Sequence, residues 1–170
     1  MDIVLLNTIN AHTVGLVSLL KDSVDNGASV GYLAPLSPNE SLQYWLDVEH
    51  QLEKGEKALF IALLGEKVVG TVQLAPVSKP NGNHRAEVEK LLVHKSCRGA
   101  GIGTRLMARV ELEARNLGLR LLLLDTREGD PASALYRKLG FVEAGKIPDF
   151  ALNEYGSGYD PTVIFYKPLV

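Results

Sequence analysis

A glycine-rich segment, Arg98-Gly99-Ala100-Gly101-Ile102-Gly103, is the stretch of the chain best suited to hold a ligand. Glycines let a backbone approach a ligand closely and turn its N–H groups toward it. A periodic apolar pattern follows, so the partly positive N-terminus of a helix should lie directly behind the segment. Arg98 adds a guanidinium that forms charge-assisted hydrogen bonds with phosphate oxygens. Together these features predict a binding site for a pyrophosphate.

Two other phosphate-binding patterns do not fit this segment. A dinucleotide-binding fingerprint would need its third glycine at Thr104 or Leu106, depending on where the pattern starts, and neither residue is glycine. A Walker loop ends in Gly-Lys followed by Ser or Thr, and no such tripeptide follows. The alternative that remains is a glycine-rich turn that only connects a strand to a helix.

Three acidic side chains and one phenol could take part in proton transfer. Glu87 and Glu89 fall in one strand-like segment and share a face if that strand is regular. Asp125 ends another such segment, and an unpaired carboxylate buried on a strand would be costly without a partner or a purpose. Tyr136 lies in a short helical segment. The alternatives are a solvated or salt-bridged side chain for each acid and a core ring for the tyrosine.

Other reactive residue types show no catalytic pattern. Cys97 lies beside Arg98 with His94 three residues earlier, but turn positions at this spacing make no nucleophile–base pair. His94 and Lys95 form either a basic rim for phosphates or a solvated turn. The histidines lack the spacing of metal ligands, so we expect no metal site: they are His12, His50, His84 and His94.

The elements around these residues follow from periodicity and caps. Residues 3–6 predict a short buried strand, and apolar residues at helical spacing predict a helix over 14–24 that Gly27 ends. Ser37 and Glu40 form a capping box, which predicts the start of a second helix.

From residue 57 onward, strand-like segments alternate with helical ones. The pattern predicts an α/β (α+β) fold, a mixed sheet flanked by helices, in the order β-α-α-β-β-β-α-β-α-β-β. The expected strands cover residues 58–64, 68–77, 85–93, 121–125, 141–144 and 162–166, and the expected helices cover 102–117 and 131–139.

Composition and charge narrow the class of protein. The chain has 170 residues, 46% hydrophobic and 22% charged, with a formal net charge of −2, which is typical of one soluble domain over residues 1–170. This charge favours neither nucleic acid nor an anionic membrane as a partner. The single cysteine, the lack of long apolar runs and a start without a signal-peptide pattern lead us to expect a cytoplasmic location.

Two signatures resemble those of the GNAT acetyltransferases. The first is Arg98-x-x-Gly101-x-Gly103, and the second, about 30 residues later, is Ala134-Leu135-Tyr136-Arg137-Lys138-Leu139-Gly140-Phe141. The resemblance implies the GNAT fold, with a mostly antiparallel central sheet of about seven strands and about four flanking helices. It also implies acetyl-CoA as cosubstrate, no metal, and direct attack of an amine on the acetyl group.

The resemblance also implies how the cosubstrate binds. Leu91, Leu92 and Val93 would splay from the neighbouring parallel strand and pair with the pantetheine arm, with an N–H near Leu92 or Val93 facing the thioester oxygen. The pyrophosphate would lie against the loop formed by Arg98, Gly99, Ala100, Gly101, Ile102, Gly103 and Thr104. Gly129 departs from the family pattern, since many members have an asparagine there that contacts CoA.

Catalytic roles follow from the same resemblance. Tyr136 would give a proton to the leaving thiolate, and Glu87 and Asp125 would accept a proton from the amine. Glu89 would replace Glu87 if a bulge shifts the register of the strand.

Further blocks resemble the tabtoxin-resistance acetyltransferases within the family. They are Gly27-Ala28-Ser29-Val30-Gly31, Lys79-Pro80-Asn81-Gly82, Arg85-Ala86-Glu87-Val88, Leu124-Asp125-Thr126 and Pro161-Thr162. This resemblance implies a small-molecule amine as acceptor: an amino-acid-like metabolite, a toxin or an antibiotic. The acceptor pocket would form from residues 27–32 and 148–159, with Asp149, Glu154 and Asp160 suited to an ammonium group. We also expect a homodimer.

Two alternative functions stay open. A protein or peptide N-acetyltransferase would have an open groove and act on peptides. A non-catalytic acetyl-CoA-binding regulatory module would have no task for Tyr136 and the acids.

Overall fold

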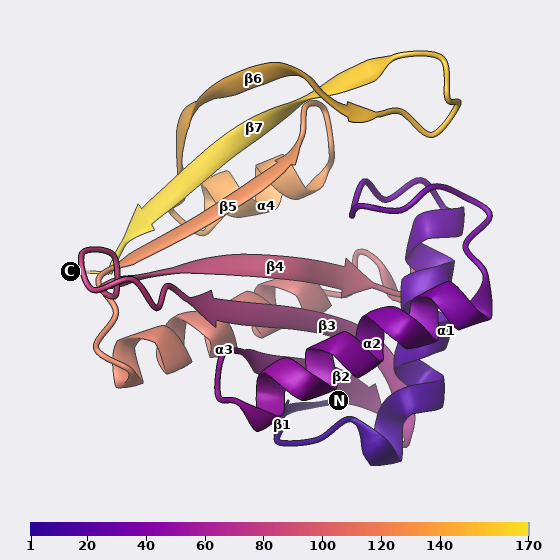
Figure 1. Ribbon diagram of the computed structural model, residues 1–170, viewed down its shortest axis with the longest axis horizontal. Helices are drawn as coiled ribbons and strands as arrows, with labels where there is room; N and C mark the ends of the chain where they lie inside the picture. Colours follow the sequence, from indigo (N-terminus) through magenta and orange to yellow (C-terminus); the bar gives the residue numbers. More distant parts are fainter. Residues whose placement is uncertain (170) are drawn as a thin grey trace.

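A seven-stranded sheet with helices on both faces forms the protein, whose computed structural model describes residues 1–169 (Figure 1). The strands are β1 (Asp2–Leu6), β2 (Ala58–Leu64), β3 (Lys67–Pro76), β4 (Arg85–Val93), β5 (Leu121–Arg127), β6 (Val142–Leu152) and β7 (Tyr159–Pro168). The α-helices are α1 (Thr13–Asp25), α2 (Pro38–Glu53), α3 (Ile102–Asn116) and α4 (Ala132–Lys138), with 3-10 turns at η1 (Asn10–His12) and η2 (Lys95–Cys97). The predicted fold class and the predicted order of strands and α-helices are confirmed. None of the helices within residues 1–169 combines the length and the apolar content that crossing a membrane would require.

The order of strands across the sheet is β1-β2-β3-β4-β5-β7-β6. Within the described residues, β4 and β5 are parallel and every other neighbouring pair is antiparallel. The sheet is therefore mixed but mostly antiparallel, as the resemblance implied.

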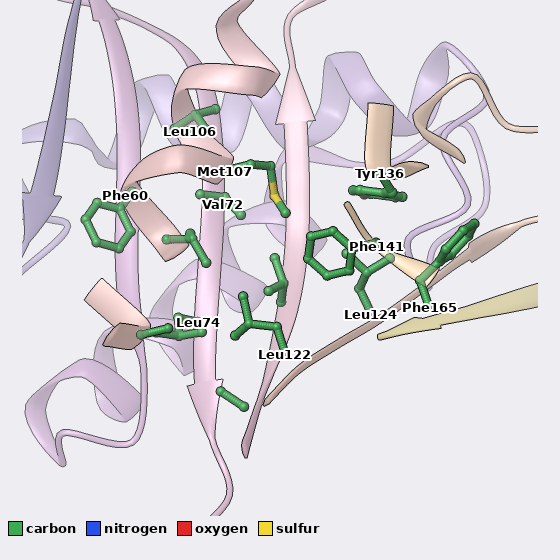
Figure 2. Packing of buried hydrophobic residues seen from close by; sticks show 14 of the residues in the cluster. Phe60, Val72, Leu74, Leu106, Met107, Leu122, Leu124, Tyr136, Phe141 and Phe165 are labelled. Atoms are coloured by element: carbon green, nitrogen blue, oxygen red, sulfur yellow. The ribbon is translucent and has the colours of Figure 1, made fainter. Parts of the chain in front are cut away.

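The two faces of the sheet carry separate hydrophobic cores. α3 and α4 cover one face, the α3 face, where Leu106, Leu122 and Phe165 belong to one cluster (Figure 2). α1 and α2 cover the other face, the α1/α2 face, around Leu20 and Trp45. Each fully buried side chain of this size contributes about 1.5–3 kcal/mol to folding, so both layers are fastened firmly to the sheet.

Local signals position the helices as the sequence predicts. The hydroxyl of Ser37 accepts a hydrogen bond from the Glu40 N–H at 3.2 Å, and the Glu40 carboxylate accepts one from the Ser37 N–H at 3.1 Å. Gly27 follows the end of α1 with φ +88°, a left-handed conformation that suits glycine. The carboxylate of Asp130 accepts from the Ala132 N–H at 2.8 Å at the start of α4.

β4 and β5 pair only where they begin. Their register joins Arg85, Ala86 and Glu87 to Leu121, Leu122 and Leu123, and it stops there. Beyond these residues the strands diverge, which leaves a gap in the middle of the sheet. The splay expected from the resemblance is therefore present.

The closing strands are longer than the sequence pattern predicts. β6 runs over Val142–Leu152 and β7 over Tyr159–Pro168, whereas the pattern indicated only 141–144 and 162–166. β6 lies at the edge of the sheet, paired with β7 alone, and nearly all its residues are exposed. An exposed edge strand need not alternate apolar and polar residues, so periodicity underestimates its length.

Candidate active site

A cleft of about 1260 Å³ opens where β4 and β5 diverge. Its walls come from β4, β5, α4, the loop before α3, the loop after α1 and the β6–β7 hairpin. Twelve of the thirteen predicted site residues line it, and the exception is Ala100: the lining residues are Glu87, Leu91, Leu92, Val93, Arg98, Gly99, Gly101, Ile102, Gly103, Thr104, Asp125 and Tyr136. The fold thus gathers separate stretches of the sequence around one cavity.

The loop that leads into α3 presents a run of free amides. Within residues 1–169, no backbone N–H from Gly99 to Thr104 donates to a protein acceptor, and the first N–H to close a helical turn is that of Arg105, onto Gly101 at 3.2 Å. These donors stand at the positive end of a 15-residue helix. Such an arrangement fits a pyrophosphate, whose oxygens accept several hydrogen bonds.

Gly99 and Gly101 give this loop its shape. Their φ angles are +77° and +76°, in the left-handed region that other residues rarely adopt. A Cβ at either position would meet nothing within 4 Å, so the space beside the amides is open. Gly103 matters for packing instead, because a Cβ at this position would lie only 3.2 Å from Leu135 of α4.

Arg98 fastens the loop to the end of β4. Its Nε donates to the carbonyl of Val93 at 3.2 Å, while the side chain stays exposed. The remaining N–H groups of the guanidinium are therefore available to a phosphate, whereas Ala100 does not line the cleft.

A β-bulge at Lys90 changes the direction of the side chains along β4. The register with β3 passes from Gln73 opposite Glu89 to Thr71 opposite Leu92. Lys90 lies in the bulge with φ +49°. As a result Val88 packs in the core of the α3 face and Leu92 in the core of the α1/α2 face, although both are even-numbered.

Beyond the bulge, two amides of β4 face the cleft. The His94 N–H donates to the carbonyl of Val69 on β3 at 2.9 Å. Backbone groups of alternate strand residues point to the same side, so the N–H of Leu92 also faces β3. The N–H groups of Leu91 and Val93 then face the cleft. Of the two donors expected near the thioester oxygen, Val93 is suitably placed and Leu92 is not, because of this alternation.

Tyr136 is held in the cleft wall by core packing. Its ring lies 5.9 Å from the rings of both Phe141 and Phe165 (Figure 2). The side chain is 6% exposed, and its hydroxyl has no hydrogen-bond partner in residues 1–169. Burial raises the pKa of Tyr136, and the nearby Asp130 and Asp125 raise it further. The phenol therefore stays protonated near neutral pH, as a proton donor must.

Glu87 and Asp125 lie on the face of the sheet opposite Tyr136. Glu87 is next to Leu123 in the parallel register, and Asp125 is two residues further along β5 on the same face. Neither carboxylate is buried, because the open cleft exposes both. Asp125 accepts a hydrogen bond from the Thr162 hydroxyl at 2.8 Å, whereas Glu87 has no partner in residues 1–169. Both carboxylates are therefore within reach of water and of a molecule bound in the cleft.

Glu89, the substitute for Glu87, is engaged elsewhere. Its carboxylate lies 2.5 Å from the ammonium of Lys57, which also donates to Gln73 at 3.2 Å. Gln73 in turn donates to the hydroxyl of Tyr44 at 2.8 Å. The carboxylate of Glu89 is therefore occupied by an ion pair, whereas that of Glu87 is not. Glu87 and Glu89 both lie before the bulge in β4, so the bulge does not shift the register at Glu87. It therefore gives no reason to assign the expected role of Glu87 to Glu89.

Other reactive side chains make no second catalytic group. Cys97 lines the cleft, but the imidazole of His94 is directed elsewhere: Nδ1 lies 2.8 Å from the Ser96 hydroxyl and Nε2 lies 3.6 Å from Asp22. Within the part of the chain that the structure describes, no three His, Cys, Asp or Glu side chains are grouped as metal ligands.

The expected acceptor segments meet at the far end of the cleft. Residues 26–31 after α1 line it, as do Phe150 and Asp160 of the closing hairpin. Asp149 and Glu154 do not line it, although an ammonium-binding role was expected for both. Glu154 instead contacts Gly27, where a Cβ would lie 2.5 Å from its carboxylate.

No sequence pattern singles out Arg127, yet it ties together the walls of the acceptor end. Its Nη2 donates to the carbonyl of Gly27 at 3.0 Å, and its guanidinium lies 3.7 Å from Asp130 and 4.0 Å from Asp160. The only available signal was its position two residues after a predicted strand, over 121–125. Arg127 therefore fixes the loop after α1 against β5 and the hairpin.

Replacing Arg127 with Met should loosen that loop. Methionine keeps much of the apolar volume but loses the charge-assisted hydrogen bond to Gly27, so the amides of residues 26–31 should exchange with deuterium about tenfold faster. Hydrogen–deuterium exchange read by mass spectrometry measures this, with α3 as the internal reference. Unchanged exchange at 26–31 would show that other contacts hold the loop.

Comparison with known proteins gives a consistent result. Residues 24–141 match the model of a family described as the acetyltransferase (GNAT) family, a span that contains both sequence signatures. The chain is 36% identical over 140 residues to an IAA acetyltransferase of Azospirillum brasilense, which covers 81% of this chain and 84% of the relative. It is 26% identical over 150 residues to an L-methionine sulfoximine/L-methionine sulfone acetyltransferase of Pseudomonas paraeruginosa, covering 87% and 84% of the two chains.

A solved structure shares the fold. It is that of a protein from Salmonella typhimurium with its cofactor acetyl-CoA, at a TM-score of 0.78 and 17% identity, covering 100% of this chain and 95% of that one.

Proposed function

The chain belongs to the GNAT acetyltransferase family and takes acetyl-CoA as its acetyl donor, and we propose that it transfers the acetyl group to a primary amine of a small molecule by direct attack. The observation that carries the proposal is the cleft itself. One side of the gap between β4 and β5 presents free amides and a phenol, and the other side presents two exposed carboxylates. An acyl donor and an amine can therefore approach each other from the two faces of the sheet.

The cosubstrate site is built from the backbone. The amides of Gly99 and of residues 101–104 would hold the pyrophosphate together with the guanidinium of Arg98, because these amides line the cleft at a helix N-terminus and have no protein acceptor in residues 1–169. The free edge of β4 from Leu91 to Val93 would pair with the pantetheine arm. When bound, acetyl-CoA supplies an acetyl group already activated as a thioester.

Groups of the protein lining the cleft can carry out the remaining steps of the reaction. Glu87 and Asp125 accept the proton that an ammonium must lose before it can attack. The amides of Leu91 and Val93 stabilise the negative charge that develops on the acyl oxygen, a contribution of about 3 kcal/mol per donor in comparable sites. Tyr136 gives its proton to the departing sulfur.

Direct attack is favoured over an acyl-enzyme route. Cys97 is the cleft's one thiol, and the His94 ring bonds to Ser96 instead of activating it.

Tyr136 and the two acids, Glu87 and Asp125, would serve no purpose in a module that only binds acetyl-CoA.

Relatives that act on small molecules support the acceptor class. Two relatives are named for small molecules, one for IAA and the other for L-methionine sulfoximine or sulfone. An amino-acid-like amine therefore stays our proposal for this chain. Four finer expectations stay predictions: the match to tabtoxin resistance, the homodimer, the single-domain organisation and the cytoplasmic location.

A coupled assay tests the proposed function. Purified protein is mixed with acetyl-CoA and a panel of amines and peptides, free CoA is measured with a thiol reagent, and acetylated products are identified by mass spectrometry. We expect CoA release that depends on a small amine. Activity on peptides alone would point to a protein N-acetyltransferase, and binding of acetyl-CoA without release in any mixture would point to a regulatory module.

Replacing Glu87 with Gln should lower kcat/KM for the amine about tenfold at neutral pH, with a smaller loss at high pH. The amide cannot take up the proton, but Asp125 remains, and an amine already deprotonated at high pH needs no acceptor. A pH–rate profile of wild type, Glu87→Gln and Asp125→Asn measures this. A profile for Glu87→Gln that overlays the wild type would remove Glu87 from the mechanism.

A further inference from the structure

Lys90 is a partly buried cation that faces the cleft without an anionic partner. Its ammonium lies 5.6 Å from the centre of the Tyr44 ring, and the residue lines the cleft. It forms no ion pair or hydrogen bond with residues 1–169. An aromatic face supports a cation but leaves its hydrogen-bonding capacity unused.

The two carboxylates that act on Lys90 make their hydrogen bonds with other groups. Glu89 is paired with Lys57 at 2.5 Å, and Asp125 accepts from Thr162 at 2.8 Å. Burial lowers the pKa of Lys90, while Glu89 and Asp125 act in the opposite direction. A desolvated ammonium without its own counterion is unfavourable, so an anion entering the cleft would gain by binding there.

The bulge in β4 is what turns this side chain away from the core of the α3 face. In a regular strand residue 90 would point into the core of the α3 face, together with Ala86 and Val88. The bulge instead directs Lys90 to the α1/α2 face, where Tyr44 lies. Lys90 also keeps a left-handed backbone, with φ +49°, that glycine would adopt more easily. A strained residue that carries an unpartnered charge in a cleft indicates a binding role.

We propose that Lys90 binds an acidic group of the acceptor, so that the acceptor is an amine that also carries a carboxylate or a similar oxyanion. This inference rests on the proposed function and specifies its substrate class. Glu87 and Asp125 lie on the same face of the sheet as Lys90 and suit the ammonium end. Two carboxylates and a lysine that line the same cleft match the two charges of an α-amino acid.

Paired acceptors test the inference. A panel of L-amino acids that includes L-methionine sulfone is compared with the corresponding α-carboxamides, which keep the amine and lose the acid. For the wild type we expect kcat/KM to be at least about tenfold higher for the acids, since a charge-assisted hydrogen bond contributes at least about one factor of ten in affinity.

Lys90→Met should remove that preference. The KM for the amino acid should rise at least about tenfold, while the KM for acetyl-CoA and the rate with the carboxamide stay close to wild type. Lys90→Arg should keep most of the preference because it keeps the charge. Lys67→Met, at an exposed lysine outside the cleft, is the matched control and should behave as wild type.

The outcomes separate the two proposals. If the wild type acetylates acids and carboxamides equally, or if Lys90→Met slows both alike, the inference is overturned and the acetyltransferase function stands. If no amine in the panel is acetylated, the proposed function fails and the inference fails with it. Thermal unfolding checks that Lys90→Met is folded; its midpoint should stay close to that of the wild type, because the lost contact with the Tyr44 ring and the removal of a desolvated charge act in opposite directions.

Discussion

Tyr136→Phe should lower kcat about a thousandfold while the KM for acetyl-CoA changes less than about threefold. The substitution removes one oxygen and leaves the ring contacts with Phe141 and Phe165, both at 5.9 Å, in place. The hydroxyl has no protein partner in residues 1–169, so its removal leaves no buried group unsatisfied. A loss of turnover in this variant therefore reports on proton donation rather than on packing.

Steady-state kinetics and a thermal unfolding curve measure this prediction. Tyr166→Phe is the matched control, because that tyrosine lies on β7 and does not line the cleft. It should keep wild-type turnover. Full turnover in Tyr136→Phe would remove the tyrosine from the mechanism and leave the sulfur to be protonated by water.

Gly101→Val should weaken acetyl-CoA binding about a hundredfold or more. Gly101 caps α3 with φ +76°, and a β-branched residue opposes this left-handed backbone by about 1–2 kcal/mol. The loop then turns its amides away from the pyrophosphate, and the loss of two or more charge-assisted hydrogen bonds amounts to several factors of ten in affinity.

Gly118→Val provides the matched control at the other end of the same helix. Gly118 has φ +72°, and an added Cβ would meet nothing within 4 Å there, as at Gly101. Both variants should lose similar stability, since both introduce the same backbone strain. Isothermal titration calorimetry with acetyl-CoA should show a weaker complex for Gly101→Val alone. Equal affinities in the two variants would place the pyrophosphate away from this loop.

Local signals explain what could be predicted about the fold. The capping box of Ser37 and Glu40 depends only on residues three apart, and it forms as predicted. Gly101 adopts the left-handed conformation that a glycine-rich loop suggests, because few other residues tolerate it. Elements set by caps, glycines and apolar periodicity were therefore predicted correctly, apart from the lengths of the exposed closing strands.

The direction of side chains in β4 could not be predicted in the same way. A period of two assumes a regular strand, and the bulge at Lys90 breaks it when β4 pairs with β3. That single residue decides that Leu92 packs in the opposite core from Val88 and that Lys90 faces the cleft. The role of Arg127 could not be predicted for a related reason: Asp130 is close to it in the sequence, but its partners Gly27 and Asp160 lie far along the chain and meet it only in the folded structure.

The amino-acid order alone determined which segments become helices and strands, where the helices begin, and that a run of free amides precedes α3, because each of these depends on neighbours within a few residues. The tertiary structure decided the rest. It set how far β4 separates from β5, which amides face the gap, and that Tyr136 lies on one side of the sheet with Glu87 and Asp125 on the other. These features arise from strand pairing and side-chain packing between residues far apart in the chain. A local sequence pattern contains no information about the energies of such contacts.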